Sequence, residues 1–289
     1  MHWRGKGGTI RARECLLLAA AVCLLAFPAF SDSLSQARQA RIFGTEAQEK
    51  KAGTQKDPEK EEMRQKAILY NQSIRREQQA GYAGYYGDTA DETDKVYHEL
   101  LSEDENGVMA AVSVPSLNIL LPVMHGTHPE DLQIAAGHMY GTSLPVGGPG
   151  CNACIAAHTG LLTASLFTDL VRIRTGEYVF IYVLGEKHCY RVEEVLTVPQ
   201  GEEAPWLMAD DADRITLYTC TPPGINDHRL LVRCTRDRSS EEPEVTESSG
   251  TQDTGEEAFH RQFEEAEERA ACLLALVLFI PAFFLFILR

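Results

Sequence analysis

Two long uncharged apolar segments lie at the ends of the chain, and a basic segment precedes the first of them. Residues 15–30 carry no charge and follow a stretch with four basic residues. This order is typical of a secretory signal peptide. Sixteen helical residues span about 24 Å, slightly less than a bilayer core. Residues 1–30 are therefore predicted to be a signal peptide or an uncleaved N-terminal membrane anchor.

The C-terminal end is uncharged from Ala271 to Leu288, about 27 Å of helix. A buried core helix is the alternative, but such a helix is rarely apolar on every face. We therefore predict a transmembrane helix over residues 270–289. The positive-inside rule keeps the basic N-terminal flank in the cytosol. The residues between the two segments are then expected to lie outside the cell membrane.

The first part of the middle region is polar. Residues 31–80 are rich in charged side chains, with weak helical spacing and a plausible helix start at Asp57-Pro58. They predict a charged linker followed by one amphipathic helix. Residues 81–105 contain a loop with three tyrosines and then a short helix over Lys95–Leu101.

From Gly107 onward the pattern changes to short runs rich in Val, Ile, Leu and Tyr, separated by Gly, Pro, Asn and Asp. The runs are VMAAVSVPSLNILLPVMHG, CNACIAAHTG, YVFIYVL, CYRVEEVLTV, RITLYTC and RLLVRCT. One helical stretch interrupts them around Leu162–Leu170. Many short strands at this spacing predict an all-β barrel or sandwich over residues 106–238.

The net charge of −15 excludes a broadly basic nucleic-acid binder. Much of this charge is local, because Ser239–Glu268 holds eleven acidic residues and one arginine, a net of −10. The segment has almost no large apolar residue. It is predicted to be a disordered, self-repelling spacer over residues 239–268.

Five of the eight cysteines lie between the apolar ends, so an oxidising exterior leaves at least one thiol unpaired. Cys220 ends the run ITLYTC and is followed by the turn TPPGIND and the run RLLVR. A hairpin there places Cys220 at a strand end and returns Arg229 beside it. A cationic neighbour favours the nucleophilic thiolate. From context alone, a buried packing cysteine is an equally good interpretation.

A nucleophilic cysteine needs a proton-transfer partner, usually a histidine. His158 follows the apolar run CIAA and precedes Thr-Gly, so it too lies at a predicted strand end. His125, His138 and His228 have similar local settings, and spacing alone does not choose among the four.

Three blocks carry a resemblance to a known family. TLYTCTPPGINDHRLLVR resembles the active-site hairpin of sortases, whose signature is T-L-x-T-C followed nine residues later by Arg. HGTHPEDLQIAAGHMYGTSLPVGG and AAHTGLLTASLFTDL resemble the other two blocks of the class C, pilin-polymerising group. The resemblance implies an eight-stranded sortase β-barrel with catalytic His158, Cys220 and Arg229. Arg233, on the same strand face, is the weaker arginine candidate, and no cofactor or metal is expected.

Two features depart from the family pattern. Class C sortases usually carry an Asp-Pro-aromatic lid motif, and no such triplet occurs between Gly81 and Tyr97. Asp88 with Tyr85 or Tyr86 is the substitute we consider, in a lid held weakly by tyrosine packing. The second departure is the CxxC of Cys151-Asn-Ala-Cys154, together with Cys234. Free packed thiols, a disulfide among cysteines 151, 154, 189 and 234, or a metal site all fit these positions.

By resemblance, the chain is expected to be a membrane-anchored cysteine transpeptidase with an extracellular catalytic domain on a Gram-positive-type cell. It would cleave an LPxTG-like sorting signal between Thr and Gly through a thioacyl intermediate. The acceptor would be a pilin lysine, in pilus assembly, or a cell-wall precursor amine, so the partners are pilins or surface proteins with such a signal. The alternatives are a secreted cysteine peptidase with the same Cys–His pair, a cell-wall-anchoring sortase of another class, and a non-catalytic surface module with a zinc or redox CxxC.

Overall fold

The computed structural model describes residues 57–80, 93–102 and 107–240, together with positions 17, 21, 24, 27, 31 and 32. The helices and strands discussed below belong to one compact unit, Arg41–Leu161 with Ser165–Gln252. The predicted lid residues Asp88, Tyr85 and Tyr86 and the predicted C-terminal helix lie outside the described residues, as do nearly all of the N-terminal segment and the acidic spacer. Within the described part of the chain, no helix is long and apolar enough to cross a membrane.

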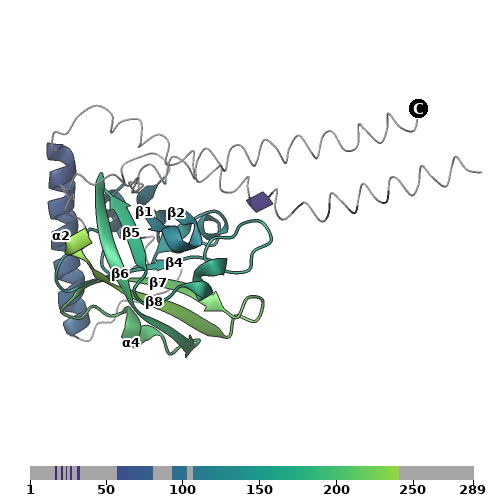
Figure 1. The fold of residues 1–289 in the computed structure, drawn as a ribbon. Coiled ribbons are helices and arrows are strands. Elements are labelled where there is room, and N and C mark those ends of the chain that lie inside the picture. Colours follow the sequence, from purple (N-terminus) through teal and green to yellow (C-terminus); the bar gives the residue numbers. More distant parts are fainter. Residues whose placement is uncertain are drawn as a thin grey trace, which may run out of the picture. The chain divides into compact units, whose positions relative to one another are not determined.

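Eight strands close into a barrel in the order β1-β2-β3-β4-β7-β8-β6-β5 (Figure 1). Their bounds are β1 Val108–Val114, β2 Ile119–His125, β3 Ala136–His138, β4 Cys151–Ala156, β5 Tyr178–Val183, β6 Glu186–Pro199, β7 Asp213–Thr221 and β8 His228–Arg236. The β2–β3 and β4–β7 pairs are parallel, and the other neighbours are antiparallel. The predicted mainly β, eight-stranded barrel is confirmed.

The side chains of β7 alternate between the two faces of the barrel wall. Ile215, Leu217 and Thr219 are buried, whereas Tyr218 and Cys220 are half-buried. Successive side chains of a strand point to opposite faces, so the first three point into the barrel and the other two point outward. This alternation places the candidate nucleophile on the outer wall.

Helix α2, Pro58–Gln79, lies alongside the barrel (Figure 1). It begins where the sequence predicts, because the Asp57 carboxylate caps it by accepting from the N–H of Glu59 and Pro58 occupies the first turn. Its buried face is partly polar. The side chain of Asn71 exchanges hydrogen bonds with the main chain of Leu144, at 3.0 and 2.7 Å. These bonds help to position the helix, in addition to apolar packing.

Helix α3, Lys95–Glu99, matches the predicted short helix. One aromatic side chain anchors this helix to the barrel. Tyr97 is fully buried, and its hydroxyl accepts from the N–H of Gly126 at 2.9 Å and lies 2.8 Å from Nδ1 of His138. Asp94 caps the helix and also accepts hydrogen bonds from the hydroxyls of Tyr70 and Tyr140.

Two local expectations differ from the structure. The helix expected around Leu162–Leu170 is instead a single 3₁₀ segment, η4, at Thr168–Arg172. Leu166 adopts a φ of 40°, which no regular right-handed helix tolerates, so the segment before η4 is irregular. Strand β3 is absent from the prediction because three residues are too few to show an alternating pattern.

Candidate active site

One end of the barrel brings three candidate residues to the same height along neighbouring segments: His158, Cys220 and Arg229. β4 runs parallel to β7 with Ala156 opposite Tyr218, and two residues further along each chain this register reaches His158 and Cys220. On the other side of β7, Cys220 is paired with Arg229 of β8. Adjacent strands lie about 4.8 Å apart. The three candidates therefore stand on three neighbouring segments, with the cysteine in the middle.

Hydrogen bonds continue this register beyond the end of β4. The N–H of Ala157 donates to the carbonyl of Tyr218 at 3.1 Å, and the hydroxyl of Thr219 donates to the carbonyl of Ala157 at 2.7 Å. The inward-pointing Thr219 thus holds the chain just before His158. Both His158 and Cys220 are half-buried, which leaves each accessible from the outer wall.

The turn between β7 and β8 packs against the loop that follows His158. The N–H of Asn226 donates to the carbonyl of Pro222 at 2.9 Å, which closes the turn. A Cβ added to Gly160 would lie 3.0 Å from Cβ of Pro223, and Gly160 has a φ of 71°. Glycine is therefore required there both by its backbone conformation and by the close approach of the turn.

The side chain of Arg229 is 9% exposed, and three hydrogen bonds hold it in place. Its Nε donates to the hydroxyl of Tyr218 at 2.8 Å, and its Nη1 donates to the carbonyls of Asn226 and His228 at 2.8 and 3.0 Å. The Tyr218 hydroxyl in turn donates to Oε1 of Glu203 at 3.1 Å. Among the described residues, Nη2 of Arg229 has no hydrogen-bond acceptor, so one edge of the guanidinium is open to a ligand.

Of the five cysteines that the structure describes, Cys220 is the one that is not buried. Cys151, Cys154, Cys189 and Cys234 are buried free thiols, so the disulfide alternative is not realised in this structure. Burial raises the pKa of Cys154 to about 12 and also raises the pKa values of Cys151 and Cys234. Buried protonated thiols are poor nucleophiles. Within the described residues, no cluster of three metal-ligating side chains occurs.

The other candidate histidines have different surroundings. His125 and His138 are 7% and 0% exposed, and one ring nitrogen of each lies against a main-chain carbonyl oxygen, at 2.7 and 2.8 Å. His228 is paired with the carboxylate of Asp227 at 2.8 Å. Of these histidines, His158 is the one that the β4–β7 register brings level with Cys220.

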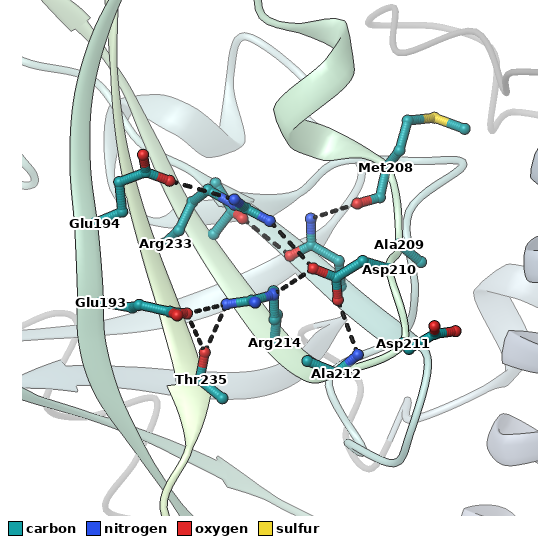
Figure 2. A network of polar contacts seen from close by, with 12 residues as sticks. Glu193, Glu194, Met208, Ala209, Asp210, Asp211, Ala212, Arg214, Arg233 and Thr235 are labelled. Atoms are coloured by element: carbon teal, nitrogen blue, oxygen red, sulfur yellow. Dashed lines mark hydrogen bonds and ion pairs between the residues drawn. The ribbon is translucent and has the colours of Figure 1, made fainter.

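Arg233, the weaker arginine candidate, takes part in a network on the outer wall (Figure 2). Its guanidinium pairs with Glu194 at 3.3 Å and with Asp210 at 3.5 Å, and it lies 5.7 Å from the ring centre of Trp206. Asp210 also accepts from Nε of Arg214 at 2.7 Å. Arg233 therefore fixes the segment between β6 and β7, whereas Arg229 keeps an open edge beside Cys220.

The sequence did not single out Asn152 or Tyr218. Asn152 is 1% exposed, and its Nδ2 donates to the carbonyls of Trp206 and Met208 at 3.2 and 3.3 Å. Its Oδ1 accepts from the hydroxyl of Thr216 at 2.9 Å. A polar residue inside the apolar run CNACIAA was the available signal for Asn152. For Tyr218 the signal was its position two residues before Cys220, on the same strand face.

An apolar surface adjoins these polar groups on the outer wall. The buried members are Met139, Cys154, Ala156, Leu207 and Leu231, and the partly buried side chains packed against them are Leu196, Val198, Trp206 and Tyr218. Trp206 and Leu207 belong to helix α4, Ala204–Leu207, which Asn152 and Arg233 hold against the barrel. The site thus combines an accessible thiol with a neighbouring apolar surface.

Comparison with known proteins matches this barrel to one family. Residues 112–237 match the sortase domain. Sortase A of Bacillus anthracis is 28% identical over 133 residues, which cover 45% of this chain and 60% of that protein. Among solved structures, sortase C-1 from Actinomyces oris is 33% identical with a TM-score of 0.55, over 62% of this chain and 98% of that one. Sortase C1 of GBS Pilus Island 1 is 35% identical with a TM-score of 0.57, over 69% and 92%.

These matches agree with the observed barrel, and the chain belongs to the sortase family. Within that family its barrel resembles the class C sortases, the group that the sequence blocks predicted. The chain spans about 60% of the Bacillus relative, so the match concerns the catalytic barrel and not that whole protein.

Proposed function

We propose that this chain is a sortase that cleaves an LPxTG-like sorting signal between Thr and Gly and transfers the Thr acyl group to an amine. The observation that carries the proposal is the alignment of His158, Cys220 and Arg229 on three adjacent segments. Cys220 is also the accessible one of the five described cysteines.

The chemistry follows from this arrangement. The thiolate of Cys220 attacks the carbonyl carbon of the Thr–Gly bond, and a tetrahedral oxyanion forms. The C–N bond then breaks as protonated His158 gives its proton to the departing glycine amine. The thioacyl enzyme next receives an amine, which attacks the same carbon while neutral His158 takes its proton. The C–S bond breaks, and the thiolate of Cys220 is restored.

Arg229 supplies the electrostatic part of this mechanism. Because Nε and Nη1 are occupied by Tyr218 and by main-chain carbonyls, the guanidinium has a fixed orientation. The open Nη2 edge belongs to Arg229, which is the β8 residue paired with Cys220. From there it donates to a substrate carbonyl and to the developing oxyanion, which costs no reorganisation in the transition state.

A pilin lysine is the acceptor that we propose, because class C sortases are among the similar structures and one of them is named for a pilus island. The uncharged segments 15–30 and 271–288 support a membrane-anchored protein with its barrel outside the cell. Protease treatment of intact cells should release a fragment that contains Cys220. A barrel that is protected until the cells are lysed would contradict this orientation.

The activity is tested with full-length protein and a sorting-signal peptide, with and without a lysine-containing acceptor peptide. We expect a mass increase on Cys220 equal to the acyl part of the peptide, and a peptide–peptide product when the acceptor is added. The Cys220→Ala variant should give neither, whereas Cys151→Ala should give both. A product that is hydrolysed peptide at every acceptor concentration would instead identify a cysteine peptidase.

A further inference from the structure

A cavity of about 640 Å³ lies at the other end of the strands that carry the candidate site. Its lining includes Cys151, the first residue of β4, and Asp213, the first residue of β7. Arg236, the last residue of β8, also lines it. The seven residues from Asp213 to Cys220 correspond to about 23 Å of strand. The cavity is therefore separate from the thiol, and its volume is in the range of small-ligand sites.

The cavity is strongly basic although the chain is acidic. Arg64 and Arg75 reach it from α2, and Arg236 and Arg238 reach it from the end of β8 and the 3₁₀ segment η5, Arg238–Ser240. The one acidic residue of the lining is Asp213. Four guanidinium groups and one carboxylate give the lining a formal charge of +3, in a chain whose net charge is −15.

The glycine-rich loop before β4 makes room for two of these arginines. A Cβ on Gly150 would lie 1.5 Å from Nη1 of Arg75, and a Cβ on Gly147 would lie 2.8 Å from Nη1 of Arg236. Both glycines have positive φ, 77° and 69°. Any larger residue would displace a guanidinium, so the loop and the arginines form one built surface.

Apart from a 3.4 Å hydrogen bond from Nη1 of Arg75 to the carbonyl of Pro149, the present partners of the two α2 arginines are exposed carboxylates. Nη2 of Arg75 pairs at 2.7 Å with Asp211, whose side chain is fully exposed. Nε of Arg64 is buried and has no hydrogen-bond partner among the described residues, and its contact with Glu186 is a 3.5 Å ion pair. Ion pairs with exposed partners contribute little. An incoming anion with several oxygens can therefore replace these partners at small cost.

We propose that this cavity binds a phosphate-bearing ligand, with a diphosphate group as the best match to its charge. Guanidinium groups are planar forks that fit phosphate oxygens two at a time. A carboxylate has two oxygens and can fill only one guanidinium fork. The guanidinium groups of this cavity reach it from α2, β8 and η5, so a ligand with more oxygens can contact several of them at once. Ile68 and Val146 line the same cavity and provide an apolar surface for an organic group esterified to the phosphate.

The test uses full-length protein in detergent and isothermal titration calorimetry with three probes. Inorganic diphosphate represents a free phosphate source, glycerophosphoglycerol represents the headgroup of an anionic lipid, and citrate provides charge as carboxylates. We expect saturable one-to-one binding of diphosphate and at least tenfold weaker binding of citrate. Competition by glycerophosphoglycerol would identify a lipid headgroup as the source, and its absence would favour a free diphosphate ester. Citrate that binds as tightly as diphosphate, or no saturable binding of any phosphate probe, would overturn the proposal.

Matched variants locate the binding. Arg64→Gln and Arg75→Gln should each weaken diphosphate binding about tenfold, the loss expected for one charge-assisted hydrogen bond. Arg76→Gln is the control, because it makes the same charge change on an exposed position of the same helix. Its affinity for diphosphate should stay within about twofold of the wild-type affinity. Arg238→Gln, at an exposed position, tests the cavity without disturbing packing. Equal losses in Arg76→Gln and the three cavity variants would mean non-specific charge attraction and would refute the site.

Discussion

Tyr218→Phe is the substitution that best tests how the candidate site is positioned. It keeps the aromatic ring on the outer wall and removes one hydroxyl, which accepts from Nε of Arg229 at 2.8 Å and donates to Glu203 at 3.1 Å. The hydroxyl does not touch the reacting atoms in the proposed mechanism. Its effect on catalysis should therefore come through the orientation of Arg229.

The magnitude follows from the contacts that Arg229 loses and keeps. A hydrogen bond to a charged group contributes about 1.5–3 kcal/mol, and about 1.4 kcal/mol changes a rate tenfold. Arg229 keeps its two Nη1 bonds to main-chain carbonyls, so its orientation is loosened and not abolished. We expect kcat/KM to fall about tenfold, and Arg229→Ala to lower it by about 10² or more.

The assay measures kcat/KM with a fluorescence-quenched sorting-signal peptide between about pH 5.5 and 9, together with the thermal midpoint. Burial raises the pKa of Tyr218 above its ordinary value, so the phenol stays protonated across this range. The midpoints of the pH profile should therefore be the same in Tyr218→Phe and wild type. Tyr178→Phe is the control, because Tyr178 is 39% exposed and stacks on Phe180 without a hydrogen bond from its hydroxyl among the described residues.

Three outcomes would refute this reasoning. Activity of Tyr218→Phe within twofold of wild type would show that the hydroxyl does not position Arg229. An equal loss in Tyr178→Phe would show a general effect of removing a hydroxyl. A shifted pH midpoint would mean that Tyr218 takes part in proton transfer.

The remaining predictions concern the thiol, the histidine and the half-buried carboxylate of Asp94. Cys220→Ala should remove thioacyl formation without lowering the thermal midpoint by more than about 3 °C, whereas Cys151→Ala should stay active and lose stability because it opens a small cavity. His158→Ala should lower kcat/KM by about 10² or more and His228→Ala by much less; similar losses in two folded variants would leave His158 unsupported. Burial raises the pKa of Asp94, but hydrogen bonds from the Tyr97 N–H and two tyrosine hydroxyls outweigh it and lower the pKa below its ordinary value. Its contribution is then fully present above about pH 4 and is lost as the pH falls through the lowered pKa, so the stability difference between wild type and Asp94→Asn should be constant from pH 5 to 8 and shrink in more acidic solution.

Much of the fold was accessible from local sequence because its signals are local. The alternation of β7 and the turn TPPGIND specify a hairpin without any distant partner, and the structure pairs Cys220 with Arg229 as that hairpin requires. The cap at Asp57 likewise marks the start of α2 through its own neighbours. The 3₁₀ segment at Thr168–Arg172 was missed because its apolar residues resemble those of a helix, whereas its irregular backbone depends on the surrounding loop.

The candidate histidine shows where local information ends. Four histidines had similar settings in the sequence, and no spacing within one segment distinguishes them. The parallel pairing of β4 with β7 joins segments about sixty residues apart and brings His158 level with Cys220. Such a pairing is decided by the closure of the whole barrel, since every strand must find two neighbours.

The sequence by itself determined the strand-rich barrel region, the Cys220–Arg229 hairpin and the family resemblance, because each depends on residues close together along the chain. The tertiary structure alone decided which thiols are buried, which arginine keeps an open edge, and that four arginines from α2, β8 and η5 converge on one cavity. These features depend on which segments pack against one another. Burial and converging charge are properties of that packing, and no local pattern records them.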